Sequence, residues 1–178
     1  MLTQEWRIRA AFAVVLVCGA VLVGLVGTRT PVPLAAAGEV VFRIGGDVER
    51  PQQWALDDLA KLPRREVRAR DRDGTEATFA GVALVDLLRL AEVPLGEKLR
   101  GSNMALYLLI EAADGYRVVF ALPELDPAFT ERVALLADRR DGQPLSAAEG
   151  PLRLVVPDEK RQARWVRQVG SCTVRRAP

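Results

Sequence analysis

The sequence predicts an α+β fold, namely one mostly antiparallel, β-rich domain that is preceded by a single N-terminal hydrophobic helix. Three observations predict it: Asp-Gly pairs separate segments with strand character, the helical segments are few and short, and strands and helices do not alternate regularly. Asp-Gly suits tight hairpin turns, which need residues with positive φ. The irregular order of elements disfavours a parallel, doubly wound sheet.

Two hairpins are expected around Asp-Gly pairs. Asp73-Gly74 separates residues 66–70 from 75–79, and Asp114-Gly115 separates residues 105–112 from 116–122. A third pair is Asp141-Gly142. Further strands are predicted at 40–44, 152–156, 165–169 and 173–175.

Two helices are predicted at residues 56–62 and 84–91. The first has Asp57 and Asp58 in its opening turn, where acidic groups interact favourably with the helix dipole. In the second, apolar residues recur at helical spacing and form one face.

The N-terminal segment has the pattern of an export signal. Residues 10–28 contain no charge, and Arg7 and Arg9 precede them. The run is just long enough to span a bilayer, and the small residues 35–37 would allow cleavage before Gly38. We therefore expect residues 1–37 to be a signal peptide or a membrane anchor with a linker, and both alternatives stay open.

This division places the domain, residues 38–178, outside the cytoplasm, in the periplasm or on the outer face of the cytoplasmic membrane. If the segment is not cleaved, residues 10–28 contact the membrane. A membrane or extracytoplasmic protein partner is compatible with this location.

Charge and composition exclude several classes of function. The chain has 25 Lys+Arg and 23 Asp+Glu; residues 1–37 hold three of the former and one of the latter, which leaves 22 of each in the domain. This balance argues against a nucleic-acid partner, which requires a basic excess. The sequence has no histidine, so it lacks the commonest general base and metal ligand. Cys18 and Cys172 lie in different segments and are not expected to pair.

A basic run near the C-terminus is the main candidate for a binding site. It lies within residues 153–176 and comprises Arg153, Lys160, Arg161, Arg164, Arg167, Arg175 and Arg176, with Trp165 among them. Arg can hold phosphate with two parallel hydrogen bonds, which favours an anion site. The alternative is a set of outward-facing strand positions balanced by Asp158 and Glu159. Strand neighbours alternate, so Arg164 and Trp165 could not both face one ligand.

Other candidates are weaker. Tyr116 follows the second Asp-Gly turn and is expected at the mouth of a pocket, with a core position as the alternative. The segment 71–74 has part of a calcium-loop pattern, which an exposed hairpin tip also explains. A lone Cys172 is typical of a small buried apolar residue. No metal site is predicted.

Several strings, taken in order, resemble the oxidoreductase molybdopterin-binding domain, which has the sulfite-oxidase-type fold. The strings are Trp54-Ala55-Leu56-Asp57-Asp58-Leu59, Phe79-Ala80-Gly81-Val82-Ala83-Leu84 with Asp86-Leu87-Leu88, Asp114-Gly115-Tyr116, Asp141-Gly142-Gln143-Pro144-Leu145, Gly150-Pro151-Leu152-Arg153-Leu154-Val155-Val156-Pro157 and Arg164-Trp165-Val166-Arg167.

The resemblance implies a pterin cofactor that carries molybdenum through a dithiolene, with one protein cysteine as a further metal ligand. That cysteine would precede the string that begins at Gly81 by a short stretch. The corresponding residues here, 67–78, contain no cysteine, and no other side chain present there replaces a soft thiolate. The family's histidines are also absent. Molybdopterin is thus the cofactor that the resemblance implies, and molybdenum is not expected.

The resemblance also assigns residues to a site. Tyr116 matches an active-site tyrosine, and Arg153, Arg164, Trp165 and Arg167 would lie near the phosphate end of the cofactor. The interpretation that follows is an extracytoplasmic molybdopterin-binding-like module without molybdenum redox catalysis. Its alternatives are a working molybdenum oxidoreductase with an unusual ligand set, and a structural, membrane-tethered accessory subunit.

Overall fold

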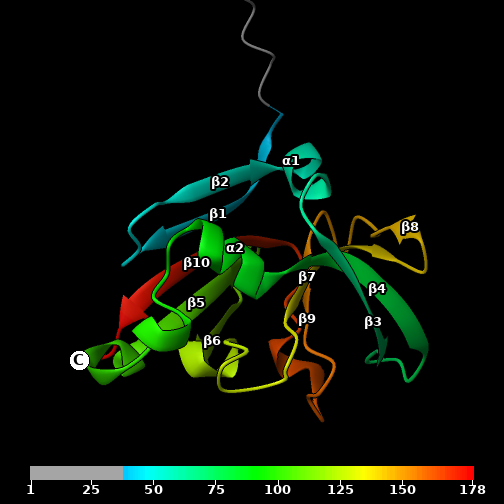
Figure 1. Ribbon diagram of the computed structural model, residues 1–178. Coiled ribbons are helices and arrows are strands. Elements are labelled where there is room, and N and C mark those ends of the chain that lie inside the picture. Colours follow the sequence, from blue (N-terminus) through cyan, green and yellow to red (C-terminus); the bar gives the residue numbers. More distant parts are fainter. Residues whose placement is uncertain (1–37) are drawn as a thin grey trace, which may run out of the picture. The chain divides into compact units, whose positions relative to one another are not determined.

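Two β-sheets form the part of the chain that the computed structural model describes, residues 38–178 (Figure 1). The first sheet has the order β2 (Gln52–Ala55), β1 (Val40–Gly46), β10 (Val169–Arg176), β5 (Leu106–Ala112), β6 (Arg117–Ala121). The second has the order β3 (Arg64–Arg70), β4 (Glu76–Ala83), β7 (Leu135–Arg140), β8 (Gln143–Pro144), and β9 (Arg153–Val155) also pairs with β7. Among the strand pairs of the described residues, only β1 and β10 are parallel, so the predicted β-rich, mostly antiparallel architecture is confirmed.

Both predicted hairpins are present. β3 and β4 pair antiparallel up to Arg70 and Glu76, and the turn between them contains Gly74 with φ of 86°. β5 and β6 are joined at Gly115, whose φ is 82°. Glycine suits both turns, because a side chain strains a backbone with positive φ.

The two predicted helices are also present, each slightly shorter than expected. α1 (Leu56–Ala60) carries the two acidic residues in its first turn, and α2 (Leu84–Leu90) buries most of its apolar side chains. Four short 3-10 segments complete the structure: η1 (Gly96–Lys98), η2 (Gly101–Ala105), η3 (Leu122–Glu124) and η4 (Gln162–Arg164).

The predicted strand at residues 165–169 is wrong. η4 precedes this segment, and the chain stays irregular until β10 begins at Val169. Two features interrupt a strand here: the backbone N–H of Trp165 bonds to the carbonyl of Gln162, and Gln168 has a φ of 49°, outside the β region. Side chains of this segment line a pocket, while the carbonyl of Val166 still accepts a hydrogen bond from the backbone N–H of Leu154 in β9.

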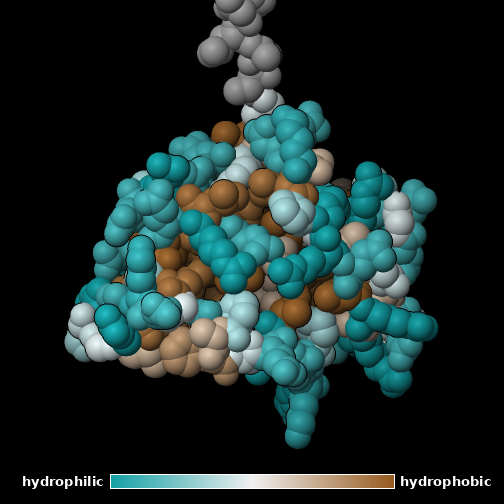
Figure 2. Space-filling model, in the orientation of Figure 1, coloured by the Kyte–Doolittle hydropathy of each residue, from teal (hydrophilic) through white to brown (hydrophobic). Residues whose placement is uncertain are grey.

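One hydrophobic core joins the two sheets. Phe42, Leu108 and Phe120 from the first sheet and Phe79 and Leu154 from the second are fully buried in the same cluster. Figure 2 shows the surface of the molecule in the orientation of Figure 1, where hydrophilic residues surround apolar ones near the middle. Because both sheets bury one face in a shared core, the turns at their ends are held in fixed relation to one another.

The expected N-terminal hydrophobic helix lies in residues 1–37, outside the described residues, and so does the expected boundary before Gly38. Within residues 38–178 no helix has the length and apolar character needed to cross a membrane.

Candidate functional site

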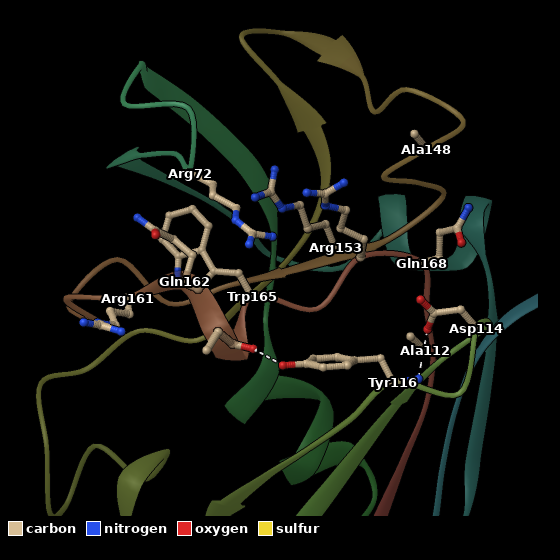
Figure 3. Close-up of a pocket in the computed structure, with 12 residues that line it drawn as sticks. Arg72, Ala112, Asp114, Tyr116, Ala148, Arg153, Arg161, Gln162, Trp165 and Gln168 are labelled. Atoms are coloured by element: carbon tan, nitrogen blue, oxygen red, sulfur yellow. Dashed lines mark hydrogen bonds between the residues drawn. The ribbon is translucent and has the colours of Figure 1, made fainter.

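A pocket of about 740 Å³ lies where several segments of the chain meet. The β5–β6 turn, the β3–β4 turn and the segment between β9 and β10 all contribute side chains to it (Figure 3). Its lining consists of Arg72, Ala112, Asp114, Tyr116, Ala148, Arg153, Arg161, Gln162, Ala163, Trp165, Arg167 and Gln168. The pocket thus lies between turns of both sheets and is lined in part by residues of the basic run.

The pocket is strongly positive. Four of its lining residues are arginines, and Asp114 is its only carboxylate. An oxygen of Asp114 accepts a hydrogen bond from the backbone N–H of Tyr116 at 2.9 Å, which closes the turn. Arg72, Arg161 and Arg167 are exposed, and none forms an ion pair with any residue of 38–178. Three uncompensated guanidinium groups around one space favour an anionic ligand.

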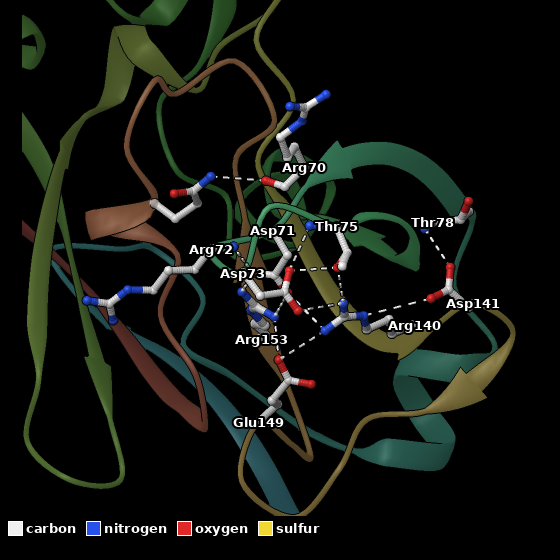
Figure 4. Close-up of polar contacts among 11 residues, drawn as sticks. Arg70, Asp71, Arg72, Asp73, Thr75, Thr78, Arg140, Asp141, Glu149 and Arg153 are labelled. Atoms are coloured by element: carbon white, nitrogen blue, oxygen red, sulfur yellow. Dashed lines mark hydrogen bonds and ion pairs between the residues drawn. The ribbon is translucent and has the colours of Figure 1, made fainter.

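The fourth arginine, Arg153, is different because it is buried and neutralised. Its Nη1 and Nη2 donate to the two carboxylate oxygens of Asp71 at 2.9 and 2.7 Å, and Nη1 also pairs with Glu149 (Figure 4). Arg140 donates to the same carboxylate of Asp71 at 3.0 Å. Asp71, Arg140, Glu149 and Arg153, here called the Asp71 cluster, contain two positive and two negative groups.

Aromatic rings complete the surroundings of Arg153. Its guanidinium carbon lies 5.3 Å from the ring centre of Phe79 and 5.4 Å from that of Trp165. Only Nε lacks a hydrogen-bond partner among the described residues, and it is buried. The guanidinium is thus held by two carboxylates and two rings, in an environment that excludes water.

Asp71 stays ionised in this environment. The hydrogen bonds from Arg153 are the main reason that the pKa of Asp71 lies below its ordinary value. A hydrogen bond of 2.6 Å from the backbone N–H of Arg72 lowers the pKa further, against the effect of burial. The carboxylate therefore remains a charged partner for Arg153.

Trp165 lines the pocket as a buried wall. Its indole N–H donates to the carbonyl of Val156 at 2.8 Å, and its ring meets Phe79 edge to face with centroids 5.9 Å apart. These contacts fix the side chain, so it can pack beside a ligand without reordering.

Arg164 is not part of the pocket lining. It pairs with Glu159 and with Glu124, where the distance is 3.0 Å, and it donates to the carbonyl of Val119 at 3.2 Å. Its guanidinium carbon also lies 4.0 Å from the ring centre of Phe120. Of the four predicted cofactor-binding residues, the structure brings Arg153, Trp165 and Arg167 together and separates Arg164 from them.

Tyr116 lies at this pocket, in agreement with the expected position beside the Asp-Gly turn. Its side chain is about half exposed, at 49%. The hydroxyl donates to the carbonyl of Ala163 at 2.7 Å and so connects the β5–β6 turn to η4 (Figure 3). A hydroxyl at this place could also accept a hydrogen bond from a ligand.

Sequence reasoning did not single out several lining residues. Arg72 lies at the hairpin tip, for which the sequence predicts a turn or a calcium loop, and Arg161 is a member of the basic run that is not among the predicted cofactor-binding residues. Gln162 and Gln168 carry no signal in the sequence: Gln162 lies in η4, and Gln168 lies in the irregular segment where a strand was expected. A charged residue beside an Asp-Gly turn was the one usable clue to Arg72.

The residues present do not fit a molybdenum centre that needs a protein thiolate. Arg72 shows that the segment 67–78, where the ligand cysteine is expected, reaches the pocket, and this segment has no cysteine. Cys172 is buried in β10 between β1 and β5, does not line the pocket, and has a pKa that burial raises far above its ordinary value. Cys18 lies outside the described residues.

The calcium-loop pattern at residues 71–74 is explained by contacts within residues 38–178. These residues contain no group of three His, Cys, Asp or Glu side chains placed to hold a metal ion. In the segment 71–74, Asp71 binds arginines and Asp73 accepts hydrogen bonds from Thr75, as expected for a hairpin tip. The guanidinium groups do fit the phosphate that a pterin cofactor carries.

Comparisons with known proteins agree with the sequence resemblance. Residues 29–178 match the family described as the oxidoreductase molybdopterin binding domain. No curated protein matches the chain significantly. Among solved structures, the sulfane dehydrogenase SoxCD from Paracoccus pantotrophus is similar, with a TM-score of 0.58 and 22% identity over 75% of this chain. The match covers 37% of the SoxCD chain, so this protein corresponds to little more than a third of that one.

We predict that Asp71→Asn lowers the free energy of unfolding at neutral pH by about 3 kcal/mol, because Arg153 keeps a buried charge without its main partner. The lowered pKa of Asp71 means that its contribution is full above the unfolded-state value near 3.8 and is lost as the pH falls through the folded-state value. The difference from wild type should therefore shrink in acid. Urea unfolding at pH 7 and at a series of decreasing pH values below about 3.8 measures it.

The matched control is Glu76→Gln on the same hairpin. It removes exposed ion pairs with Arg68 and Arg70, which should contribute about 1 kcal/mol or less. A pH-independent difference between Asp71→Asn and wild type would contradict the role of the carboxylate.

Proposed function

Because the chain belongs to the oxidoreductase molybdopterin-binding domain family, we propose that it is an extracytoplasmic module that binds a phosphate-bearing pterin but performs no molybdenum redox catalysis. One observation carries this proposal: the pocket presents no thiol and three guanidinium groups that form no ion pair within residues 38–178. The arginines suit an anion, whereas the family's metal requires a soft ligand that the pocket lacks.

The pocket's own residues would perform the binding. Arg72, Arg161 and Arg167 would hold phosphate oxygens, and the fixed Trp165 would pack against the flat part of the ligand. Tyr116, anchored to η4, would form the edge of the pocket. When bound, molybdopterin would supply a dithiolene for metal chemistry, and no residue of this pocket completes that metal's coordination through sulfur.

The domain is expected to act outside the cytoplasm. The uncharged residues 10–28 behind Arg7 and Arg9 support this proposal, since positive flanks stay on the cytoplasmic side. A membrane or extracytoplasmic protein would then be the natural partner, with the chain tethered through residues 10–28 if the segment is retained.

We predict that a phosphate-bearing pterin binds the wild-type protein and that Arg161→Gln and Arg167→Gln each weaken binding about tenfold, the effect of losing one charge-assisted hydrogen bond. Isothermal titration calorimetry measures the affinities. The control is Arg175→Gln, which removes an exposed arginine that does not line the pocket. Equal binding of the dephosphorylated pterin would contradict phosphate recognition.

We predict that the purified protein holds no stoichiometric molybdenum, because the pocket offers no thiolate. Elemental analysis after expression in a host that makes the cofactor tests this. The fold similarity to a sulfane dehydrogenase favours the competing proposal of a working molybdenum enzyme. Near one molybdenum per chain, lost in Cys172→Ser, would establish that competitor.

We predict that a reporter enzyme active only outside the cytoplasm, fused after Pro178, is active, because the N-terminal segment exports the domain. A fusion that lacks residues 1–37 is the control and should be inactive. Equal activity of the two fusions would refute export by this segment.

A further inference from the structure

The pocket contains two kinds of arginine, and one carboxylate connects them. Asp71 receives both Nη groups of buried Arg153, and its Oδ1 also accepts the backbone N–H of Arg72 at 2.6 Å. The Arg72 side chain extends away from the Asp71 cluster (Figure 4) and toward the middle of the pocket (Figure 3). The backbone of Arg72, whose side chain faces the pocket, is thus hydrogen-bonded to the buried Asp71–Arg153 pair.

Arg153 itself is poorly placed to bind an anion. Its Nη1 and Nη2 already hold Asp71 and Glu149, and Nε is buried. An anion that approached this guanidinium would have to displace one carboxylate while it stayed next to the other, and like charges repel. The guanidinium of Arg72, in contrast, pairs with no carboxylate of residues 38–178 and is exposed.

We propose that the Asp71–Arg153 ion pair is a positioning device that fixes the tip of the β3–β4 hairpin and thereby presents Arg72 as an anion-binding group of the pocket. This inference rests on the proposed function, which it deepens. Arg153 is a positioning residue in this arrangement and does not touch the ligand. Asp71 lies in the segment 67–78, where a metal-ligating cysteine is expected, and Arg153 reaches it from β9.

The other contacts of the tip support a fixed geometry. The backbone N–H of Asp71 donates to the carbonyl of Thr75 at 2.8 Å, and that of Gly74 to the carbonyl of Asp71 at 2.9 Å. Gln162 reaches across from η4 and donates to the carbonyl of Arg70 at 3.0 Å. The tip is therefore held from the core side by Arg153 and from the pocket side by η4.

Amide hydrogen exchange of the ligand-free, full-length protein tests the positioning role. In Asp71→Asn, the amides of residues 72–75 should exchange at least tenfold faster than in wild type, because the carboxylate no longer holds both Arg153 and the turn. The control Glu76→Gln, which removes exposed ion pairs of the same hairpin, should leave these rates unchanged. Unchanged protection in Asp71→Asn overturns the proposal.

A second pair of variants applies if Asp71→Asn fails to fold. Gln162→Ala removes the bond from η4 to Arg70 and should raise exchange at the tip several-fold. Gln168→Ala removes a similar bond, to the carbonyl of Ala147 at 2.9 Å, on another part of the pocket and should not. Equal effects of the two variants at the tip overturn the proposal.

Inorganic phosphate tests the binding role of Arg72. Arg72→Gln should weaken phosphate binding about tenfold, Asp71→Asn should weaken it several-fold, and the double variant should be no weaker than Arg72→Gln alone. Additive losses would mean that Asp71 does not act through Arg72. If wild type binds no phosphate, the proposed function and the role of Arg72 both fail, and hydrogen exchange alone then decides whether the ion pair holds the tip.

Discussion

The geometry of the pocket depends on the buried ion pair between Asp71 and Arg153. Arg153 begins β9, Asp71 ends the β3 side of a hairpin, and the two residues are far apart in the sequence. A charge buried this deeply destabilises the fold unless it is paired, so each residue constrains the other's position. Arg153 therefore holds the hairpin tip, the start of β9 and the ring of Trp165 in fixed positions relative to one another. Together they form one wall of the pocket.

The arginines of this chain divide according to what surrounds them. Arg153 and Arg164 both sit against aromatic rings and hold two carboxylates each, so their charges are satisfied inside the protein. The exposed arginines of the pocket find no such partners among residues 38–178. The basic run thus contains both arginines that are paired inside the protein and arginines that face the pocket. The spacing of the residues in the sequence does not distinguish these two kinds.

Much of the fold could be predicted from local patterns, because Asp-Gly turns and helical periodicity act over a few residues. The two hairpins and α2 follow from such patterns. The irregular segment after η4 could not be predicted, since the indole of Trp165 is fixed by a carbonyl nine residues away and Gln168 adopts a positive φ. For the site, Tyr116 and Trp165, both named from the sequence, line one pocket, whereas the place of Arg72 at that pocket depends on long-range contacts of the hairpin tip.

The family's fold does not depend on the thiolate of the family's metal chemistry. The fold needs two sheets, a shared core and turns that meet around a pocket, and none of these needs a thiolate. The buried charge of Arg153 needs a partner. A carboxylate at Asp71 meets that need and keeps the turn in place, so the pocket persists with a changed donor set. Guanidinium groups then decide which ligands the pocket can hold.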